Sequence, residues 1–539
     1  MIEIIKIAFS QKRFPDRLPW EKIIIVAAIV LASLATSWSF IHGWIIAYGD
    51  AESHLNIAKR VVSGLTPGLA QLGGVWLPLP HLLMIPLVIF DPLWRTGLAG
   101  SIVSGISFVI SAFFVFKLIF LITKNKLSAA VGSLIFITNP NMLYMQSTPM
   151  TELPLIVFSL ASIYYFCLYF SENGFRPLML AGGFGLAASL SRYDGWFLVT
   201  LEALIIFLHR FPFRKFGNNL ANRSLTFFTF LTDKGEGELI LFSTLAFIGI
   251  VGWLLWGYLI LGNPLYFAYS SYSAASQQKG FLALGELPAY HNLWVSFLYY
   301  FVTSMSVGGI LIFGSALIAS VIFLRDKAIK NRWFIYLLFL SPFIFNVVTL
   351  FLGQSVIYIP GLNLVRFKSW LFNVRYGLLM VPAMAVLFGY LFGKVSSWGK
   401  VFLITLLIVN LGFFATGYSP VLTLAEGTLG ISKSSHPDAE NWLSQHYDYG
   451  LVLMDDYGRA ISIIGSGIPM QDIVYVGSRF YWQEALQAPQ LRIRWVVMQK
   501  NDAVWKALYS TGEEQGRLYK YFRKVYSSES ILIFERNNQ

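Results

Sequence analysis

The stretch IIIVAAIVLASLATSWSFIHG, residues 23–43, decides the class of fold to which this chain belongs. As an α-helix it would be about 30 Å long, which matches the hydrocarbon core of a lipid bilayer. The order of a basic segment and then an apolar run is also found in signal peptides, but this run is too long and more apolar runs follow. We therefore expect an uncleaved first membrane span with its N-terminus in the cytoplasm. The basic residues before it are Lys6, Lys12, Arg13, Arg17 and Lys22.

The composition of the whole chain indicates a membrane protein. Of its 539 residues 56% are hydrophobic and 13% are charged, and the mean hydropathy is +0.61. A soluble globule cannot bury so much apolar surface. The net charge of +12 could indicate nucleic-acid binding, but the basic residues cluster between apolar runs, as cytoplasmic loops do. We expect the lipid bilayer as a partner and no nucleic acid. The single cysteine, Cys167, excludes a disulfide framework and a cysteine-based metal site.

Ten further apolar runs predict a total of about eleven transmembrane helices. When the spans alternate, the basic clusters between them fall on the side of the N-terminus. The run Pro78–Phe90 holds three prolines and is about 13 residues long, so we expect it to lie in the outer interface. The ten runs are 98–122, 127–140, 153–170, 177–191, 196–209, 239–262, 293–324, 333–352, 376–393 and 400–418.

This topology predicts a polytopic α-helical domain at 1–418 and a small extracytoplasmic α/β domain at 419–539. The protein would be a multi-pass protein of the plasma membrane, and its first outer loop would be 44–97. Further outer segments would be 139–152, 263–292 and 353–375. In the C-terminal domain the pattern predicts a helix at Asp438–His446 and strands at Gly450–Met454, Leu491–Gln499, Phe522–Tyr526 and Ile531–Glu535.

The first two outer loops carry acidic residues close to the bilayer. The sequence YGDAESH, residues 48–54, places Asp50, Glu52 and His54 at alternate positions. These charges either form part of a site or belong to a solvated loop that avoids lipid. The second loop has one acid, Glu152, at the mouth of the next span, where Thr151 and Glu152 could also cap a helix.

Two later segments carry cations toward the same face. The run Pro177–His209 would be roughly 50 Å long as one helix, so it must turn near Arg192, Tyr193 and Asp194. Arg192 and Asp194 could simply pair with each other. Outer cations beside outer carboxylates suit a substrate with an anionic head and a hydroxyl to deprotonate, although residues at a bilayer boundary also snorkel. The second segment contains Arg366, Lys368, Arg375 and Tyr376.

The order and sidedness of these loops resemble the GT-C glycosyltransferases. The resemblance is to the branch of dolichyl-phosphate-mannose protein mannosyltransferases and aminoarabinose lipid transferases, and it covers residues 1–418 and, more loosely, the C-terminal domain. It implies a hexosyl- or mannosyltransferase that moves a sugar from a polyprenyl-phosphate donor to a hydroxyl acceptor on the outer face, with inversion. The first loop has Asp-Ala-Glu where the protein mannosyltransferases have adjacent Asp-Glu. The acceptor class (protein, lipid or glycan) therefore stays open.

The resemblance also implies roles for individual residues. Asp50 would be the general base, with Glu52 and Glu152 as its assisting carboxylates. Arg192 and Arg375 would hold the leaving lipid phosphate. The further substrate contacts would be His54, Tyr193, Asp194, Tyr376 and, as reserve cations, Arg366 and Lys368.

We expect no cofactor and no essential metal ion. Asp50, Glu52, His54 and Glu152 could in principle bind a divalent cation, but the sequence has no clear metal pair of the kind that oligosaccharyltransferases use.

The rival interpretation is a transporter or flippase for a lipid-linked or anionic substrate, with Arg192, Asp194 and Glu202 along its pathway. A transporter would carry charges at several depths, whereas here the acids collect on one face. A third interpretation, a membrane scaffold that displays the outer domain, needs none of these charges.

Overall fold

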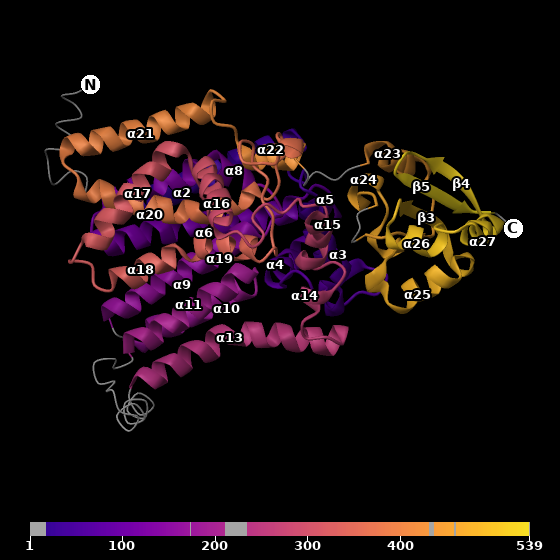
Figure 1. The fold of residues 1–539 in the computed structure, drawn as a ribbon, viewed down its shortest axis with the longest axis horizontal. Coiled ribbons are helices and arrows are strands. Elements are labelled where there is room, and N and C mark those ends of the chain that lie inside the picture. Colours follow the sequence, from indigo (N-terminus) through magenta and orange to yellow (C-terminus); the bar gives the residue numbers. More distant parts are fainter. Residues whose placement is uncertain (1–17, 173, 211–233, 431–435, 457–459, 538–539) are drawn as a thin grey trace.

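The computed structural model describes residues 18–172, 174–210, 234–430, 436–456 and 460–537. A large bundle of helices forms one part of the molecule, and the C-terminal sheet domain lies at one end of it (Figure 1). The elements of the bundle are α2 (Trp20–Ile41), α6 (Leu98–Thr123), α7 (Lys126–Thr138), α9 (Glu152–Glu172), α10 (Phe175–Ser189), α11 (Tyr193–Arg210), α13 (Lys234–Leu261), α16 (Leu293–Gly308), α17 (Ile310–Arg325), α18 (Arg332–Phe339), α19 (Ser341–Phe351), η4 (Val374–Met380), α20 (Val381–Lys394) and α21 (Ser397–Ala415).

The protein is a multi-pass membrane protein. Within the described residues, six helices are long and apolar enough to cross a bilayer, or eight if each of two bent pairs is one span. The expected number of eleven is not confirmed. The turn expected near Arg192 is confirmed, since α10 ends at Ser189 and α11 begins at Tyr193.

Two runs that we expected to be straight spans are bent. The run 293–324 divides into α16 and α17, with a bend of 115° between them, and the run 333–352 divides into α18 and α19, with a bend of 51°. The first break lies at Gly309, whose φ is +88°, and a Cβ there would lie 2.2 Å from the Asn410 side chain of α21. The chain can turn there because glycine alone tolerates both this backbone conformation and this close approach.

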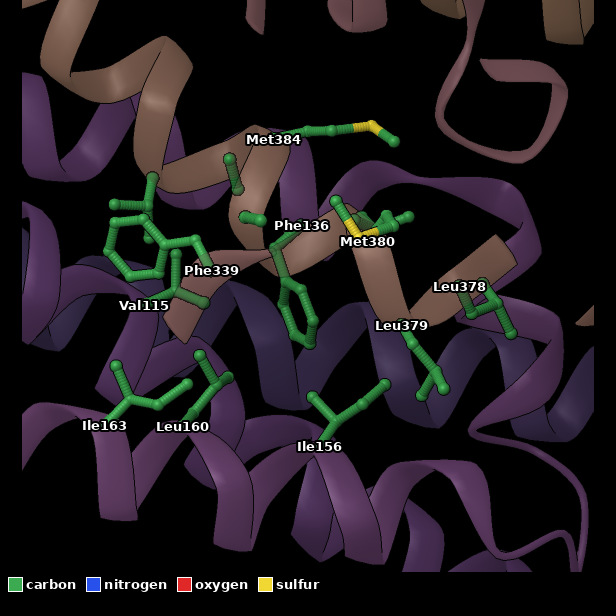
Figure 2. Close-up of a cluster of buried hydrophobic side chains, with 14 of the residues drawn as sticks. Val115, Phe136, Ile156, Leu160, Ile163, Phe339, Leu378, Leu379, Met380 and Met384 are labelled. Carbon is green, nitrogen blue, oxygen red and sulfur yellow. The ribbon is translucent and has the colours of Figure 1, made fainter. Parts of the chain in front are cut away.

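The core of the bundle surrounds η4 and α20. In the apolar window Val374–Lys394, 89% of the residues are buried, against 22% in α2 and 17% in α21. Figure 2 shows Phe136 of α7, Ile156 of α9 and Leu379 of η4 in this core. The outer helices keep apolar side chains on their exposed faces because lipid solvates such side chains as well as a protein core does.

Short helices join the long helices, and several of them lie at the end of the bundle that faces the C-terminal domain (Figure 1). The run Pro78–Phe90 gives the ten-residue helix α4, which is too short to cross a bilayer. These short elements are α3 (Gly49–Ser63), η1 (Leu69–Leu72), α4 (Leu79–Val88), α5 (Asp91–Arg95), α8 (Pro140–Met145), α14 (Tyr266–Tyr269), α15 (Ala274–Ala283), η3 (Val365–Phe367) and α22 (Leu422–Leu429).

The C-terminal domain is a five-stranded sheet in the order β2-β1-β3-β5-β4 with helices around it. Strands β1, β2 and β3 pair in parallel, whereas β5 pairs antiparallel with β3 and β4. All four expected strands and the expected helix are present, and the two-residue strand β2 was not predicted. The elements are α23 (Pro437–His446), β1 (Leu451–Leu453), α24 (Ile463–Ser466), η5 (Met470–Asp472), β2 (Ile473–Val474), η6 (Val476–Ser478), α25 (Phe480–Gln487), η7 (Pro489–Leu491), β3 (Ile493–Gln499), α26 (Ala503–Leu508), α27 (Gly512–Tyr521), β4 (Phe522–Ser527) and β5 (Ile531–Arg536).

The expected domain boundary at 418/419 stays a prediction. Helix α22 lies just beyond it and packs against α8 and η4 of the bundle.

Candidate active site

Asp50 lies in the first turn of α3, at the end of the bundle that faces the C-terminal domain. A carboxylate is favoured there because the helix N-terminus carries a partial positive charge. The side chain of Asp50 is 23% exposed, so solvent reaches it. Just before it, Tyr48 is fully buried and its hydroxyl donates a hydrogen bond to the carbonyl of Thr423, over 2.6 Å.

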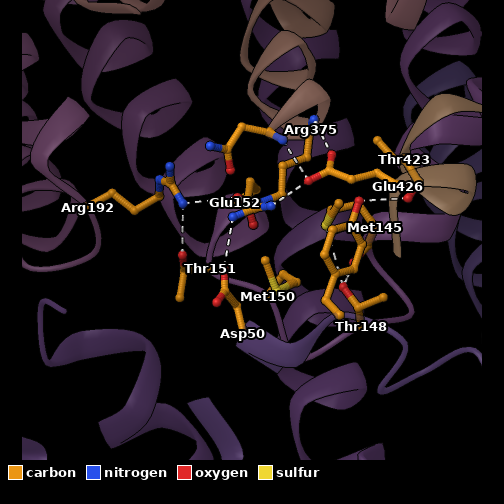
Figure 3. Close-up of polar contacts among 12 residues, drawn as sticks. Asp50, Met145, Thr148, Met150, Thr151, Glu152, Arg192, Arg375, Thr423 and Glu426 are labelled. Carbon is orange, nitrogen blue, oxygen red and sulfur yellow. Dashed lines mark hydrogen bonds and ion pairs between the residues drawn. The ribbon is translucent and has the colours of Figure 1, made fainter. Parts of the chain in front are cut away.

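Arg375 of η4 joins three carboxylates from distant parts of the chain (Figure 3). Its Nη2 lies 2.9 Å from Asp50 Oδ2, its Nε lies 3.3 Å from Glu152 Oε1, and its Nη1 lies 2.7 Å from Glu426 Oε1. The side chains of Glu152 and Glu426 are 0% exposed. A buried guanidinium needs such partners because an unpaired buried charge costs several kcal/mol.

A second arginine, Arg192, shares Glu152 with Arg375. Its Nη1 lies 3.0 Å from Glu152 Oε1 and donates to Thr151 Oγ1 over 3.1 Å, while its Nε lies 3.3 Å from Asp194 Oδ2. Glu152 therefore bridges the two guanidinium groups (Figure 3). The pairing of Arg192 with Asp194 that we considered from the sequence does form, but within this larger cluster.

Tyr376 lies between the two arginines. Its ring centroid is 5.2 Å from the guanidinium carbon of Arg192 and 5.3 Å from that of Arg375. An aromatic face attracts a cation, so this ring holds the two positive groups close together.

Two buried oxygens of this cluster lack a hydrogen-bond partner among the residues that the structure describes. They are Glu152 Oε2 and Asp194 Oδ1. Buried polar atoms are usually satisfied, so these acceptors are candidates for contacts with a ligand.

His54 lies one helical turn after Asp50 on α3, and it is buried. Its Nδ1 is 2.9 Å from Nε2 of His81 on α4, and its ring packs against Trp76. Burial and the neighbouring His81 hold the pKa of His54 well below its ordinary value. Tyr193, at the start of α11, donates from its hydroxyl to the carbonyl of Val75 over 2.6 Å.

Three of the expected site residues make their contacts elsewhere. Glu52 Oε1 accepts a hydrogen bond of 3.0 Å from the backbone N–H of Ile464 in the C-terminal domain, and burial raises the pKa of Glu52. Arg366 is half exposed and pairs with Glu286 over 3.1 Å. Lys368 is exposed.

The structure therefore brings together Asp50, Glu152, Arg192, Asp194, Arg375 and Tyr376, with His54 beside them. Glu426 of α22 was not predicted as a site residue, because it is a single acid in a segment assigned to the C-terminal domain. Its position just after the last apolar run was the only available signal.

An apolar pocket reaches this cluster from inside the bundle. It lies between α9, α11, α18, α19, η4 and α20, and Asp194 is its one charged lining residue. Figure 2 shows part of its apolar wall. Residues that line it include Ile156, Leu160, Leu198, Phe339 and Leu379.

No group of three or more His, Cys, Asp and Glu side chains lies close enough to hold a metal ion within the described ranges. The expectation of no essential metal remains a prediction.

Comparisons with known proteins show the fold. No family model matches the sequence, and no curated protein matches it. ArnT from Cupriavidus metallidurans bound to undecaprenyl phosphate is similar in structure over 96% of this chain and 97% of its own, with 11% identity and a TM-score of 0.57. The apo state of ArnT is similar over 93% and 97%, with 12% identity and a TM-score of 0.51. The oligosaccharyltransferase AglB from Archaeoglobus fulgidus, in complex with an inhibitory peptide and a dolichol-phosphate, has a TM-score of 0.47 at 13% identity over 97% and 74%. The resemblance expected from the sequence is confirmed for the fold, which is the fold of ArnT.

Proposed function

We propose that this protein is a glycosyltransferase that moves a sugar from a polyprenyl-phosphate donor to a hydroxyl acceptor. The observation that carries the proposal is the cluster itself. Two arginines are bridged by the buried Glu152, and one of them, Arg375, pairs with the partly exposed carboxylate of Asp50. The cluster borders an apolar pocket, which Asp194 lines. The ArnT fold supports it, because one structure with that fold is bound to undecaprenyl phosphate.

Arg192 and Arg375 are the proposed phosphate ligands. A guanidinium can donate two parallel hydrogen bonds to a phosphate and offset its charge. The apolar pocket beside Asp194 would receive the first part of the prenyl chain, since its walls are as apolar as the lipid.

Binding of the phosphate would also change the state of Asp50. Arg375 is shared among Asp50, Glu152 and Glu426, and a phosphate would compete with them for the guanidinium. Asp50 is 23% exposed, whereas the other two carboxylates are fully buried. Asp50 is therefore the partner that can be released most readily, and its release makes it available as a base.

In the proposed reaction, Asp50 accepts the proton of the acceptor hydroxyl. The hydroxyl oxygen then bonds to the anomeric carbon of the sugar, while the bond from that carbon to the phosphate oxygen breaks. The electron pair of the broken bond goes to the phosphate, which leaves as polyprenyl phosphate, held by the arginines. Attack on the face opposite to the phosphate inverts the anomeric centre.

The sugar would lie beside the two unsatisfied oxygens. Glu152 Oε2 and Asp194 Oδ1 can accept hydrogen bonds from sugar hydroxyls. Such acceptors can bind the hydroxyls of the hexosyl or mannosyl donor that the sequence resemblance implies. The acceptor could be a protein, a lipid or a glycan.

The orientation in the membrane is also a proposal. The basic loops support a cytoplasmic N-terminus, with the cluster and the C-terminal domain on the outer face of the plasma membrane.

Binding of undecaprenyl phosphate to the purified protein tests the donor site. Lysine keeps the charge of an arginine but loses its two-pronged geometry. We expect Arg375→Lys to weaken binding about tenfold or more, as the loss of one charge-assisted hydrogen bond implies. The matched control is Arg366→Lys, an exposed arginine that also pairs with a glutamate. Equal affinity in the two variants would contradict the proposed phosphate site.

A further inference from the structure

The histidine pair beside the cluster is placed to contact the acceptor. His54 lies four residues after Asp50 in α3, and residues with that spacing share one face of a helix. Asp50, Arg192 and Arg375 all act electrostatically on His54. The charged and titratable groups around the ring include His81 from α4, which contacts it, and Asp50 from α3, Arg192 from the start of α11 and Arg375 from η4, whose charges act on it.

The hydrogen-bond partners of His81 determine which nitrogen of His54 carries the proton. The pair is joined by His54 Nδ1 and His81 Nε2, at 2.9 Å. Nδ1 of His81 has no hydrogen bond of good geometry to any described residue, and the backbone group that acts on this ring is that of Leu77. A backbone interaction that favours the protonated ring comes from a carbonyl, which can only accept. With the proton of neutral His81 on Nδ1, where a backbone carbonyl can accept it, Nε2 of His81 accepts from His54 Nδ1. This is the tautomer on which the proposal rests.

The other nitrogen of His54 is then an acceptor. With its proton on Nδ1, His54 has an unprotonated Nε2. No described residue forms a hydrogen bond with Nε2. A nearly buried ring thus presents one open acceptor next to the carboxylate proposed as the base.

We propose that His54 Nε2 accepts a hydrogen bond from the acceptor substrate, and that His81 is a positioning residue that keeps Nε2 unprotonated. This inference rests on the proposed function. A hydroxyl has one proton, which goes to Asp50, so the bond to His54 must come from a second donor group. The acceptor would therefore carry a second hydroxyl, amine or amide N–H roughly one helical turn, about 5 Å, from the reacting hydroxyl.

The first test measures the tautomer of His54 by nitrogen NMR of protein labelled with ¹⁵N-histidine. His54→Gln assigns the signals. We expect an unprotonated Nε2 in the wild type and a protonated Nε2 in a substantial fraction of His81→Leu. In His81→Gln the side-chain oxygen replaces the accepting nitrogen, so Nε2 stays unprotonated. Identical His54 signals in the wild type and His81→Leu would overturn the positioning role.

The second test follows release of radiolabelled sugar from polyprenyl-phosphate donors, with membrane extract added at increasing concentration to supply acceptors. We expect His81→Leu to raise the half-saturating extract concentration about tenfold, the effect of one lost hydrogen bond, with the affinity for undecaprenyl phosphate unchanged. His81→Gln should restore saturation near the wild-type value. Equal losses in both His81 variants would overturn the inference. If the wild type releases no sugar from any donor, the proposed function fails, while the NMR result still decides the tautomer.

Discussion

At the scale of single residues, Arg375 explains how the site tolerates so many charges. Its three carboxylate partners come from α3, α9 and α22. Removing one member of a buried ion pair usually costs more than the pair contributes, because the remaining charge is left unsatisfied. A change at Arg375 therefore tests folding as well as binding, and for this reason lysine is the informative substitution.

The His54–His81 pair predicts a loss of stability in acid. Burial lowers the pKa of His81 from 6.5 to about 4. Below pH 6.5 the unfolded chain therefore binds a proton that the folded protein excludes until about pH 4. The free energy of unfolding should fall across this window by up to about 3 kcal/mol, since one pKa unit is worth about 1.4 kcal/mol.

Thermal unfolding between pH 7 and pH 4 measures this effect. His81→Gln should lose less stability on acidification than the wild type. His446→Gln is the matched control because His446 is exposed, and it should follow the wild-type curve. Parallel curves for all three proteins would contradict the buried, neutral state of His81.

Most of the cluster could be predicted from the sequence, because charged residues beside a bilayer are costly unless they pair with one another or line a polar site. Asp50, Glu152, Arg192 and Arg375 were all identified in this way, and they lie in one network. Glu52 carries the same charge as Asp50 and lies in the same predicted loop, but it contacts Ile464 in the C-terminal domain. Only the direction in which each side chain leaves α3 separates Asp50 from Glu52, and one sequence does not give that direction.

At the scale of elements, the break between α16 and α17 depends on Gly309. Alanine there would meet Asn410 and would adopt a backbone conformation that is essentially restricted to glycine. We expect Gly309→Ala to destabilise the protein by about 1–3 kcal/mol from the backbone alone. In Gly314→Ala a Cβ meets nothing within 4 Å, so α17 should tolerate the change. The difference between their unfolding temperatures is the measurement, and equal temperatures would contradict the bent geometry.

A second element, α3, links the site to the C-terminal domain. Arg60 of α3 is 1% exposed, pairs with Asp456, and lies with its guanidinium carbon 4.1 Å from the centroid of the Tyr475 ring. Arg60→Ala leaves Asp456 without this partner, which should cost about 3–5 kcal/mol. We expect faster hydrogen exchange in α3 and α24 and reduced turnover, because α3 also carries Asp50.

Arg492→Ala is the matched control for this contact. Arg492 lies in the C-terminal domain and forms an exposed pair with Glu484, so its loss should change exchange in α3 very little. Unchanged exchange in Arg60→Ala would show that the domain does not hold α3 in place.

The elements themselves were largely predictable. Apolar length located most of the helices, and alternating or apolar runs located four of the five strands. The bends at Gly309 and at Leu340 were not predicted, since an apolar run has the same composition whether its helix is straight or bent.

At the scale of the whole molecule, the basic loops predict which face is outside. Cys167 is the only cysteine, so a Cys167→Ser background allows single cysteines to be labelled in intact cells with an impermeant maleimide. We expect labelling of Ser510→Cys in the C-terminal domain, and labelling of Lys327→Cys only after the cells are permeabilised. Both positions are exposed. The reverse pattern would place the cluster on the cytoplasmic face.

The central claim is glycosyl transfer with Asp50 as the base, and one comparison tests it most directly. Purified wild type and Asp50→Asn are incubated with a panel of radiolabelled polyprenyl-phosphate sugars and membrane extract, and affinity for undecaprenyl phosphate is measured in parallel. Loss of a general base should slow transfer about 10²- to 10⁴-fold, while undecaprenyl phosphate binds at least as well because one competitor for Arg375 is gone. Equal transfer by the two proteins, or no transfer by the wild type from any donor, would contradict the account.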